Sequence, residues 1–233
     1  MNVAGIEIEI IKKNIKNMHL SVVPPDGRVR ISAPLSIGNE AIQLFAISKI
    51  GWIKKQIEKF QNQQRQSERE YVSGESHYLW GKRYRMEIRY TRGNSKVELN
   101  GNKMIFTIHS ESTANQRQNT LNEWYRRHLK VKLPSLFDKW EKVIGIHANE
   151  VKVKNMLTKW GSCSTEAKRI WINLQLVKKP IECLEYIVVH ELVHLLEKSH
   201  NKQFVAYMDA FLPDWRTRKE LLNSFIMDKY LSE

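Results

Sequence analysis

Two histidines at helical spacing are the residues of this sequence best suited to hold a metal ion. His190 and His194 lie four residues apart in the segment LEYIVVHELVHLLEKSHNKQF, residues 184–204. Residues i and i+4 lie one turn apart on the same face of a helix, so both imidazoles can bind one cation. Glu191 completes a His-Glu-x-x-His pattern, in which the carboxylate takes a proton from a metal-bound water. The spacing predicts a zinc-dependent hydrolase.

The neighbours of these histidines favour a bound metal over a chance match. A chance match is a real alternative, because a five-residue pattern with three fixed positions is not rare. Three side chains that bind ions are costly in an apolar helix unless one partner satisfies them together. The apolar neighbours are Ile187, Val188, Val189, Leu192, Val193, Leu195 and Leu196.

Catalytic zinc needs a third protein ligand, because it usually takes three and keeps one position for water. We favour His200, six residues after His194. A straight helix would turn by about 600° over that span and point His200 away. We therefore expect the helix to end near residues 198–199. Asp209 and then Asp214 are the alternative third ligands.

Length and composition are those of a globular protein. The chain has 233 residues, of which 42% are hydrophobic and 27% charged, and it is long enough to bury a core without disulfides. Its two cysteines, Cys163 and Cys183, are compatible with a reducing compartment. We expect a cytoplasmic protein, because the N-terminal stretch lacks the pattern of a signal peptide and no apolar run is long enough to cross a membrane.

The charge balance is strongly basic, with a formal net charge of +13. Such a balance favours nucleic acid, nucleotides or acidic proteins as partners, or reflects a surface of solvated lysines. In the N-terminal half we favour solvation over an acidic partner for a set of basic residues: Arg28, Arg30, Lys54, Lys55, Arg83, Arg85 and Arg89.

Hydrophobic periodicity divides the chain into a β-rich half and a mainly helical half. Strands are expected at 6–11, 16–23 and from 28 to about 34, with a proline-glycine turn at 24–27. One helix is expected over 39–65. Further strands are expected within 78–110, in the segments YRMEIRY, SKVELN and KMIFTIH, with hairpin turns at TRGN and GN.

The second half begins with a helix expected at about 115–144. Short strands follow at 151–155 and 169–173, and residues 180–231 are helical with a break near Pro213. The fold class is α+β. We expect a β-rich N-terminal region with an embedded helix over residues 1–115 and a metal-binding catalytic domain over residues 116–233.

Several motifs in order along the chain resemble the YgjP-like metallopeptidase family. PPDGRVRISAP and SKIGWIKKQ resemble its N-terminal region, and KWGSCS at 159–164 resembles its tryptophan-glycine-serine-cysteine signature. INLQLVKKP and the histidine segment match the rest. Lys159 stands where an arginine is common, which keeps the charge. The resemblance covers almost the whole chain.

The resemblance implies a zincin-like core, similar to minigluzincin-like and SprT/WLM-type zinc proteases. One helix would carry His190, Glu191 and His194, a later helix would present His200, and a small antiparallel sheet would lie beside them. The resemblance also places residues 160–163 on an edge strand near that helix. Such an edge binds an extended peptide by strand addition, so the substrate-binding residues would be Trp160, Gly161, Ser162 and Cys163.

These residues also have simpler interpretations. Trp160 can be a core residue, and Gly161 can mark a bulge or a close backbone approach. Cys163 can be a fourth ligand or a nucleophile, but a buried structural thiol is favoured. Asn173 is a further candidate for substrate binding, through a hydrogen bond to the backbone near the site, and a role in a turn is an equal alternative. The remaining histidines are expected to be surface or satisfied core residues: His19, His77, His109, His128 and His147.

The favoured function is a metallopeptidase with one zinc ion, in which Glu191 is the general base for attack on a peptide bond. The first alternative is a metal-dependent nucleotide pyrophosphatase. It rests on charge alone, because no glycine-rich phosphate loop is present. The second is a non-catalytic module that binds nucleic acid or protein through a structural zinc. A structural site usually has four protein ligands, and three good candidates are found.

Overall fold

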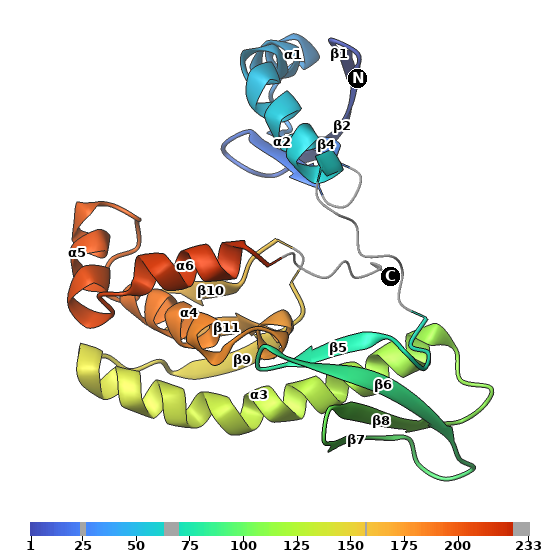
Figure 1. The fold of residues 1–233 in the computed structure, drawn as a ribbon. Helices are drawn as coiled ribbons and strands as arrows, with labels where there is room; N and C mark the ends of the chain where they lie inside the picture. Colours follow the sequence, from blue (N-terminus) through green and yellow to red (C-terminus); the bar gives the residue numbers. More distant parts are fainter. Residues whose placement is uncertain (24–26, 63–69, 157, 226–233) are drawn as a thin grey trace. The chain divides into compact units, whose positions relative to one another are not determined.

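The computed structural model describes residues 1–23, 27–62, 70–156 and 158–225 (Figure 1). They fall in two compact units, one within residues 1–67 and the other within residues 68–228. The boundary expected from sequence, at residues 115–116, falls inside the second unit, where the elements on either side share one hydrophobic core.

The first unit is a small mixed sheet with two helices. Its elements are β1 (Asn2–Val3), β2 (Ile6–Lys13), β3 (His19–Val23), β4 (Arg28–Pro34), α1 (Asn39–Ser48) and α2 (Ile50–Asn62). The strand order is β1-β2-β4-β3, with β2 parallel and β3 antiparallel to β4. The three strands expected here are confirmed. Residues 24–26 of the expected turn lie outside the described residues, and Gly27 has a positive φ of 70°.

The single helix expected over 39–65 is wrong, because α1 ends at Ser48 and α2 begins at Ile50. Lys49 caps α1 with φ −108° and ψ 6°. The Ser48 hydroxyl donates to the carbonyl of Phe45 at 2.8 Å, a local bond that competes with helix continuation. Gly51 lowers the helix propensity further. The last part of the expected helix, residues 63–65, lies outside the described residues.

The second unit begins with a four-stranded sheet of β5 (Ser76–Leu79), β6 (Lys82–Tyr90), β7 (Lys96–Asn100) and β8 (Lys103–Ile108), in the order β5-β6-β8-β7. The hairpin expected at Gly101-Asn102 is confirmed, since β7 and β8 pair antiparallel. The hairpin expected at 91–94 is wrong, because β6 pairs parallel with β8. The strongly buried β8 takes the inner position between two neighbours, which a turn motif alone does not predict.

Helix α3 (Ala114–Ile144) confirms the helix expected at 115–144. Thr113 and Gln116 form a capping box at its start, and Gly145 ends it in the left-handed conformation with φ 77°. One face of α3 is buried in the core of the second unit, through residues that include Tyr125, Leu129 and Leu133. This helix packs on α4, described next.

The third sheet and three helices complete the second unit. The sheet consists of β9 (Glu150–Lys154), β10 (Gly161–Ser164) and β11 (Arg169–Asn173), in the order β10-β11-β9, and the 3₁₀ helix η1 (Leu174–Lys178) follows. The sheet is mixed, unlike the antiparallel one implied by the resemblance, because β9 runs parallel to β11. The helices are α4 (Ile181–Val193), α5 (Lys202–Phe211) and α6 (Trp215–Asn223). The α+β class is confirmed.

The break expected near Pro213 is confirmed, and a second break separates α4 from α5. Helix α4 contacts α3, α5, α6 and β10, so it lies at the centre of the unit (Figure 1). Within the described ranges, no helix combines the length and the apolar character that crossing a bilayer requires.

Candidate metal centre

Helix α4 is buried on most sides, so it holds its side chains in fixed positions. Leu184, Val188, Val189 and Leu192 have no exposed surface. Pro180 is the N-cap of the helix, and Glu182 lies in the first turn, which is a favourable position for a carboxylate. His190, Glu191 and His194 lie at the C-terminal end of this helix, where the two histidines are partly exposed.

Three imidazoles converge at this end of α4. The ring centroids of His190 and His194 are 4.8 Å apart, and His200 lies 5.0 Å from the first and 4.6 Å from the second. The Nε2 atoms of His190 and His200 are 3.1 Å apart. One ring nitrogen of each histidine lies within 4.8 Å of the others. The three rings therefore surround a single point.

The chain returns to this point through a tight turn that begins earlier than expected. Helix α4 ends at Val193 and His194 is its cap, so the end expected near residues 198–199 is wrong. The amides of Leu195 and Leu196 donate to carbonyls three residues back, the bonding that tightens a last helical turn. His200 lies in the loop before α5, whereas the resemblance implied a position on a later helix. Asn201 caps α5 and fixes that loop.

Neighbouring groups orient the three rings. The Nδ1 atom of His194 lies 3.2 Å from the carbonyl oxygen of Glu197. This oxygen can accept a hydrogen bond from Nδ1–H, which leaves the Nε2 lone pair free for a metal. The ring of Phe204 packs on all three histidines, with centroid distances of 5.0, 4.7 and 4.7 Å. This aromatic ring closes one side of the cluster.

Burial favours the neutral form of His190 and His194. Desolvation lowers the pKa of His190 to about 3, and the nearby His194 and His200 lower it further. Burial also lowers the pKa of His194, against the opposing effect of the Glu197 carbonyl. Neutral imidazole is the form that binds metals. These two rings are therefore in the form that binds metal near neutral pH.

Glu191 is the buried carboxyl group beside this cluster, and only 4% of its surface is exposed. Burial raises the pKa of Glu191 to about 8, and the charge of Lys159 opposes that rise. A carboxyl group with a pKa near neutrality can both accept and return a proton. The position suits a group that exchanges protons with a reactant.

Gly161 lies directly against Glu191. A Cβ atom at Gly161 would be 2.4 Å from Oε1 of Glu191 and 2.8 Å from its Cδ, closer than atoms can approach. Only glycine therefore allows β10 to pass this carboxylate. The expected close backbone approach is found, and it places the start of β10 beside the candidate base.

The other residues of the WGSC segment are partly buried. Trp160 and Cys163 pack against the hydrophobic core, and the Nζ atom of Lys179 lies 5.9 Å from the Trp160 ring. Burial, and then the charge of Glu191, raise the pKa of the Cys163 thiol to about 11. A protonated thiol is a poor nucleophile. In the described residues, Cys163 is not part of the histidine cluster.

Asn173 is fully buried, and within the described residues its side chain bonds to backbone groups. Its Nδ2 donates to the carbonyls of Met156 at 2.8 Å and Lys159 at 2.6 Å. Its Oδ1 accepts from Gln175 at 3.1 Å and so caps η1. Asn173 thus holds the segment that leads into β10, and it also caps the turn that begins η1.

The alternative carboxylate ligands are engaged elsewhere. Asp209 accepts hydrogen bonds from Trp215 at 2.7 Å and from Arg216, and Asp214 pairs with Arg218 at 2.8 Å. The other histidines do not join the cluster, within the part of the chain that is described. His77 contacts Glu75, His147 contacts Glu141, His128 packs on Trp124, and His19 and His109 are exposed.

Sequence reasoning missed three residues that shape the centre. Tyr186 lies four residues before His190 and its ring is 5.7 Å from that of the histidine; helical spacing was the available signal. Phe204 carried no signal beyond the NKQF segment. Glu185 accepts hydrogen bonds from two other helices, and no pattern in the sequence predicts these contacts.

Glu185 ties α4 to α3 and α6. Lys139 and Trp140 donate to its Oε1 at 2.7 and 3.0 Å, and Arg218 donates to its Oε2 at 2.6 Å. Burial raises the pKa of Glu185, but these hydrogen bonds outweigh burial and hold the pKa at about 2. The carboxylate is therefore stabilised in the folded state.

Replacing Glu185 by glutamine is expected to lower the free energy of unfolding at pH 7 by about 1–2 kcal/mol, because three donors lose a charged acceptor at a partly exposed site. Since the folded pKa lies below the ordinary value of 4.5, this stability is complete above pH 4.5 and is lost as the pH falls towards 2. Urea unfolding at pH 7 and pH 3 measures both effects. Glu182→Gln, an exposed change on the same helix, is the control; equal effects of the two changes would contradict the account.

The comparisons with known proteins give the class of the chain. Residues 16–225 match a sequence family described as a metallopeptidase domain, so the chain is a metallopeptidase by class. This match spans most of the chain, and the chain belongs to the YgjP-like family. No curated protein matches it.

Part of the chain also resembles solved structures. One is the crystal structure of the metallopeptidase zymogen of Pyrococcus abyssi abylysin, with 20% identity and a TM-score of 0.35, over 39% of this chain and 89% of that one. Another is the metallopeptidase zymogen of Methanocaldococcus jannaschii jannalysin, with 22% identity and a TM-score of 0.36, over 41% of this chain and 98% of that one.

Proposed function

We propose that this metallopeptidase holds one zinc ion through His190, His194 and His200 and cleaves peptide bonds with Glu191 as the general base. The observation that carries the proposal is the convergence of three imidazoles beside a buried carboxyl group. Three protein ligands with a fourth position left for water distinguish a catalytic zinc site from a structural one.

One nitrogen–nitrogen distance fits a tetrahedral ion, and the three ring nitrogens lie within 4.8 Å of one another. Zinc–nitrogen bonds of about 2.0–2.1 Å at tetrahedral angles separate two ligand nitrogens by about 3.3 Å. The Nε2 atoms of His190 and His200 are 3.1 Å apart. The chemistry of the donors also fits, because neutral imidazole is a preferred zinc ligand.

Bound zinc would supply a Lewis acid that polarises the scissile carbonyl and acidifies the attacking water. Glu191 would take the proton of that water and pass it to the leaving nitrogen. Its burial excludes bulk water from this exchange. Lys159 adds a positive charge that favours the ionised form of Glu191.

The β10 edge supports peptide binding. Asn173 donates its amide to the carbonyl of Trp160 at 2.9 Å, so in this antiparallel pair residues 160, 162 and 164 face β11. The backbone groups of Gly161 and Cys163 therefore point to the open edge, because successive residues alternate. An extended substrate can pair with them beside Glu191. Trp160, Ser162 and Asn173 then position this edge.

A direct test compares substrates. Zinc-loaded protein is incubated with a mixed peptide library and, separately, with nucleoside triphosphates. We expect cleaved peptides, loss of cleavage with a chelator and recovery with one equivalent of zinc. Hydrolysis of the triphosphates without peptide cleavage would favour the pyrophosphatase alternative. Zinc that resists the chelator, with neither activity, would favour a structural role.

A further inference from the structure

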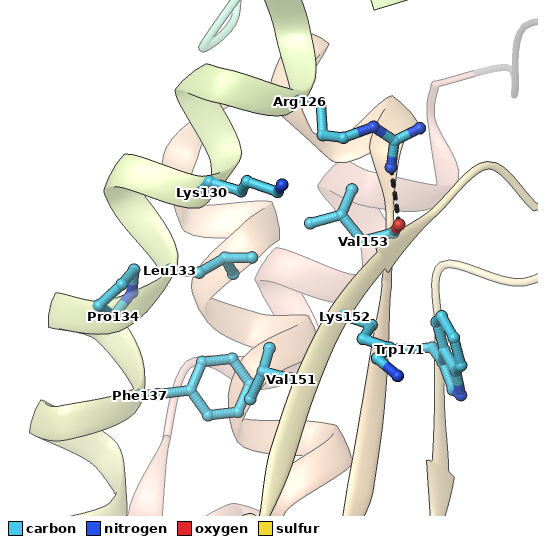
Figure 2. Close-up of a pocket in the computed structure, with 9 residues that line it drawn as sticks. All are labelled: Arg126, Lys130, Leu133, Pro134, Phe137, Val151, Lys152, Val153 and Trp171. Carbon is cyan, nitrogen blue, oxygen red and sulfur yellow. Dashed lines mark hydrogen bonds between the residues drawn. The ribbon is translucent and has the colours of Figure 1, made fainter. Parts of the chain in front are cut away.

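A groove lies on the side of the third sheet away from β10. It is bounded by α3 and β9 and has a volume of about 470 Å³ (Figure 2). Its lining contains no residue of the histidine cluster or of β10. The groove is therefore a separate surface feature, and the proposed chemistry does not account for it.

One wall of the groove is an open strand edge. Strand β9 has β11 as its one neighbour in the sheet, among the described residues. The backbone groups of residues 169, 171 and 173 in β11 point to β10. Those of residues 170 and 172 therefore point the other way and bond to residues 150, 152 and 154 of β9. The backbone groups of Val151 and Val153 therefore point into the groove. Arg126 donates to the Val153 carbonyl at 2.7 Å (Figure 2), which confirms that direction.

The opposite wall is apolar and belongs to α3. Leu133 and Phe137 face Val151 and Val153 across the groove (Figure 2), and Pro134 also lines it. Proline has no amide hydrogen, so Pro134 deprives the carbonyl of Lys130 of its usual helix donor. This wall therefore presents a largely apolar surface to the groove.

The charges around the groove are positive. Arg126, Lys130 and Lys152 line it, and no acidic residue does. On the outer face of the sheet, Lys152 and Lys154 lie 5.5 and 5.7 Å from the ring of Trp171. Glu150 is the acidic residue of β9, and it is engaged by Lys152 and Arg169.

We propose that this groove binds an extended acidic polypeptide segment, which adds to β9 as a further strand. Side chains alternate along a strand. Every second residue of the segment would point to the apolar wall of α3, and the residues between would point to Lys152 and Lys154. The preferred ligand therefore alternates apolar and acidic residues. An open strand edge and an apolar wall match a peptide backbone better than the sugar-phosphate backbone of a nucleic acid.

The test uses the full-length protein and a fluorescent, end-capped peptide of alternating valine and glutamate, with a valine–lysine peptide as its charge control. Binding is measured by anisotropy with and without zinc. We expect the acidic peptide to bind with equal affinity in both states and the basic peptide to bind at least about tenfold more weakly, because like charges face each other.

Variants locate the binding. Val151→Pro removes an edge amide without touching the bonds to β11 and is expected to weaken binding at least about tenfold. Lys130→Glu should weaken it about threefold, whereas Lys132→Glu, an exposed change outside the lining, should leave it unchanged. The double variant Lys130→Glu/Lys154→Glu should bind the basic peptide better than the acidic one. These charge variants keep the edge amide, so they do not depend on the folding of Val151→Pro.

Several outcomes would overturn the proposal. One is that both peptides bind with equal affinity, or that the acidic peptide does not bind. Another is a wild-type affinity in both Val151→Pro and Lys130→Glu. Displacement of the peptide by a single-stranded oligonucleotide at lower concentration would identify a nucleic-acid site. A concentration-dependent dimer that Val151→Pro abolishes would identify a second copy of this chain as the occupant.

Discussion

Replacing Glu191 by glutamine is expected to lower the peptidase turnover by about 10²–10⁴-fold while the protein keeps one equivalent of zinc. The amide has nearly the same size as the carboxyl group and cannot take a proton from the attacking water. The three imidazoles are untouched, because Glu191 is not part of their cluster. The measurement is a steady-state assay on the best substrate, together with metal analysis of the same sample.

Glu182→Gln provides the matched control for this change. Glu182 is an exposed carboxylate in the first turn of the same helix, and its loss should leave turnover within about twofold of wild type, as surface changes do. Glu191→Gln protein that cleaves peptide at the wild-type rate would rule out a role as general base. Loss of zinc together with activity would instead assign Glu191 to metal binding.

Replacing Gly161 by alanine is expected to lower turnover at least about 100-fold, because a displacement of catalytic groups by about 1 Å can cost that much. The added Cβ would lie 2.4 Å from Oε1 of Glu191, so either the carboxylate or β10 must move. The same overpacking should cost about 1–3 kcal/mol of unfolding free energy. Turnover and urea unfolding of the variant measure the two effects.

Two further variants separate this clash from a general effect of alanine. An added Cβ at Gly51 would have no contact within 4 Å among the described residues. Gly51→Ala should therefore leave turnover unchanged and should not lower the free energy of unfolding. Combining Gly161→Ala with Glu191→Asp shortens the opposing side chain. The stability cost of the pair should then be smaller than the sum of the single costs. Additive costs would show that the two residues do not press on each other.

The parts of the fold that sequence predicts well are those with local signals. Helix α3 combines an apolar face with a capping box at Thr113 and a terminal glycine at Gly145, and its bounds agree with expectation to one residue. The pairing of His190 with His194 also depends only on helical spacing. Local chemistry is sufficient in both cases.

The parts that sequence predicts poorly depend on contacts between distant segments. The parallel pairing of β6 with β8 and of β9 with β11 is decided by which strand is most deeply buried, and no turn motif encodes that. The return of His200 depends on a tight turn at residues 195–197 without glycine or proline. Phe204 and Glu185 act through tertiary contacts that leave no periodic pattern.

The most direct test of the account is anomalous diffraction at the zinc absorption edge from crystals of the full-length protein grown with zinc. The account predicts one strong peak within about 2.0–2.2 Å of a ring nitrogen of His190, His194 and His200, with the carboxylate of Glu191 outside bonding distance. A map without a peak between the three rings, or with a fourth protein ligand closing the site, would contradict it.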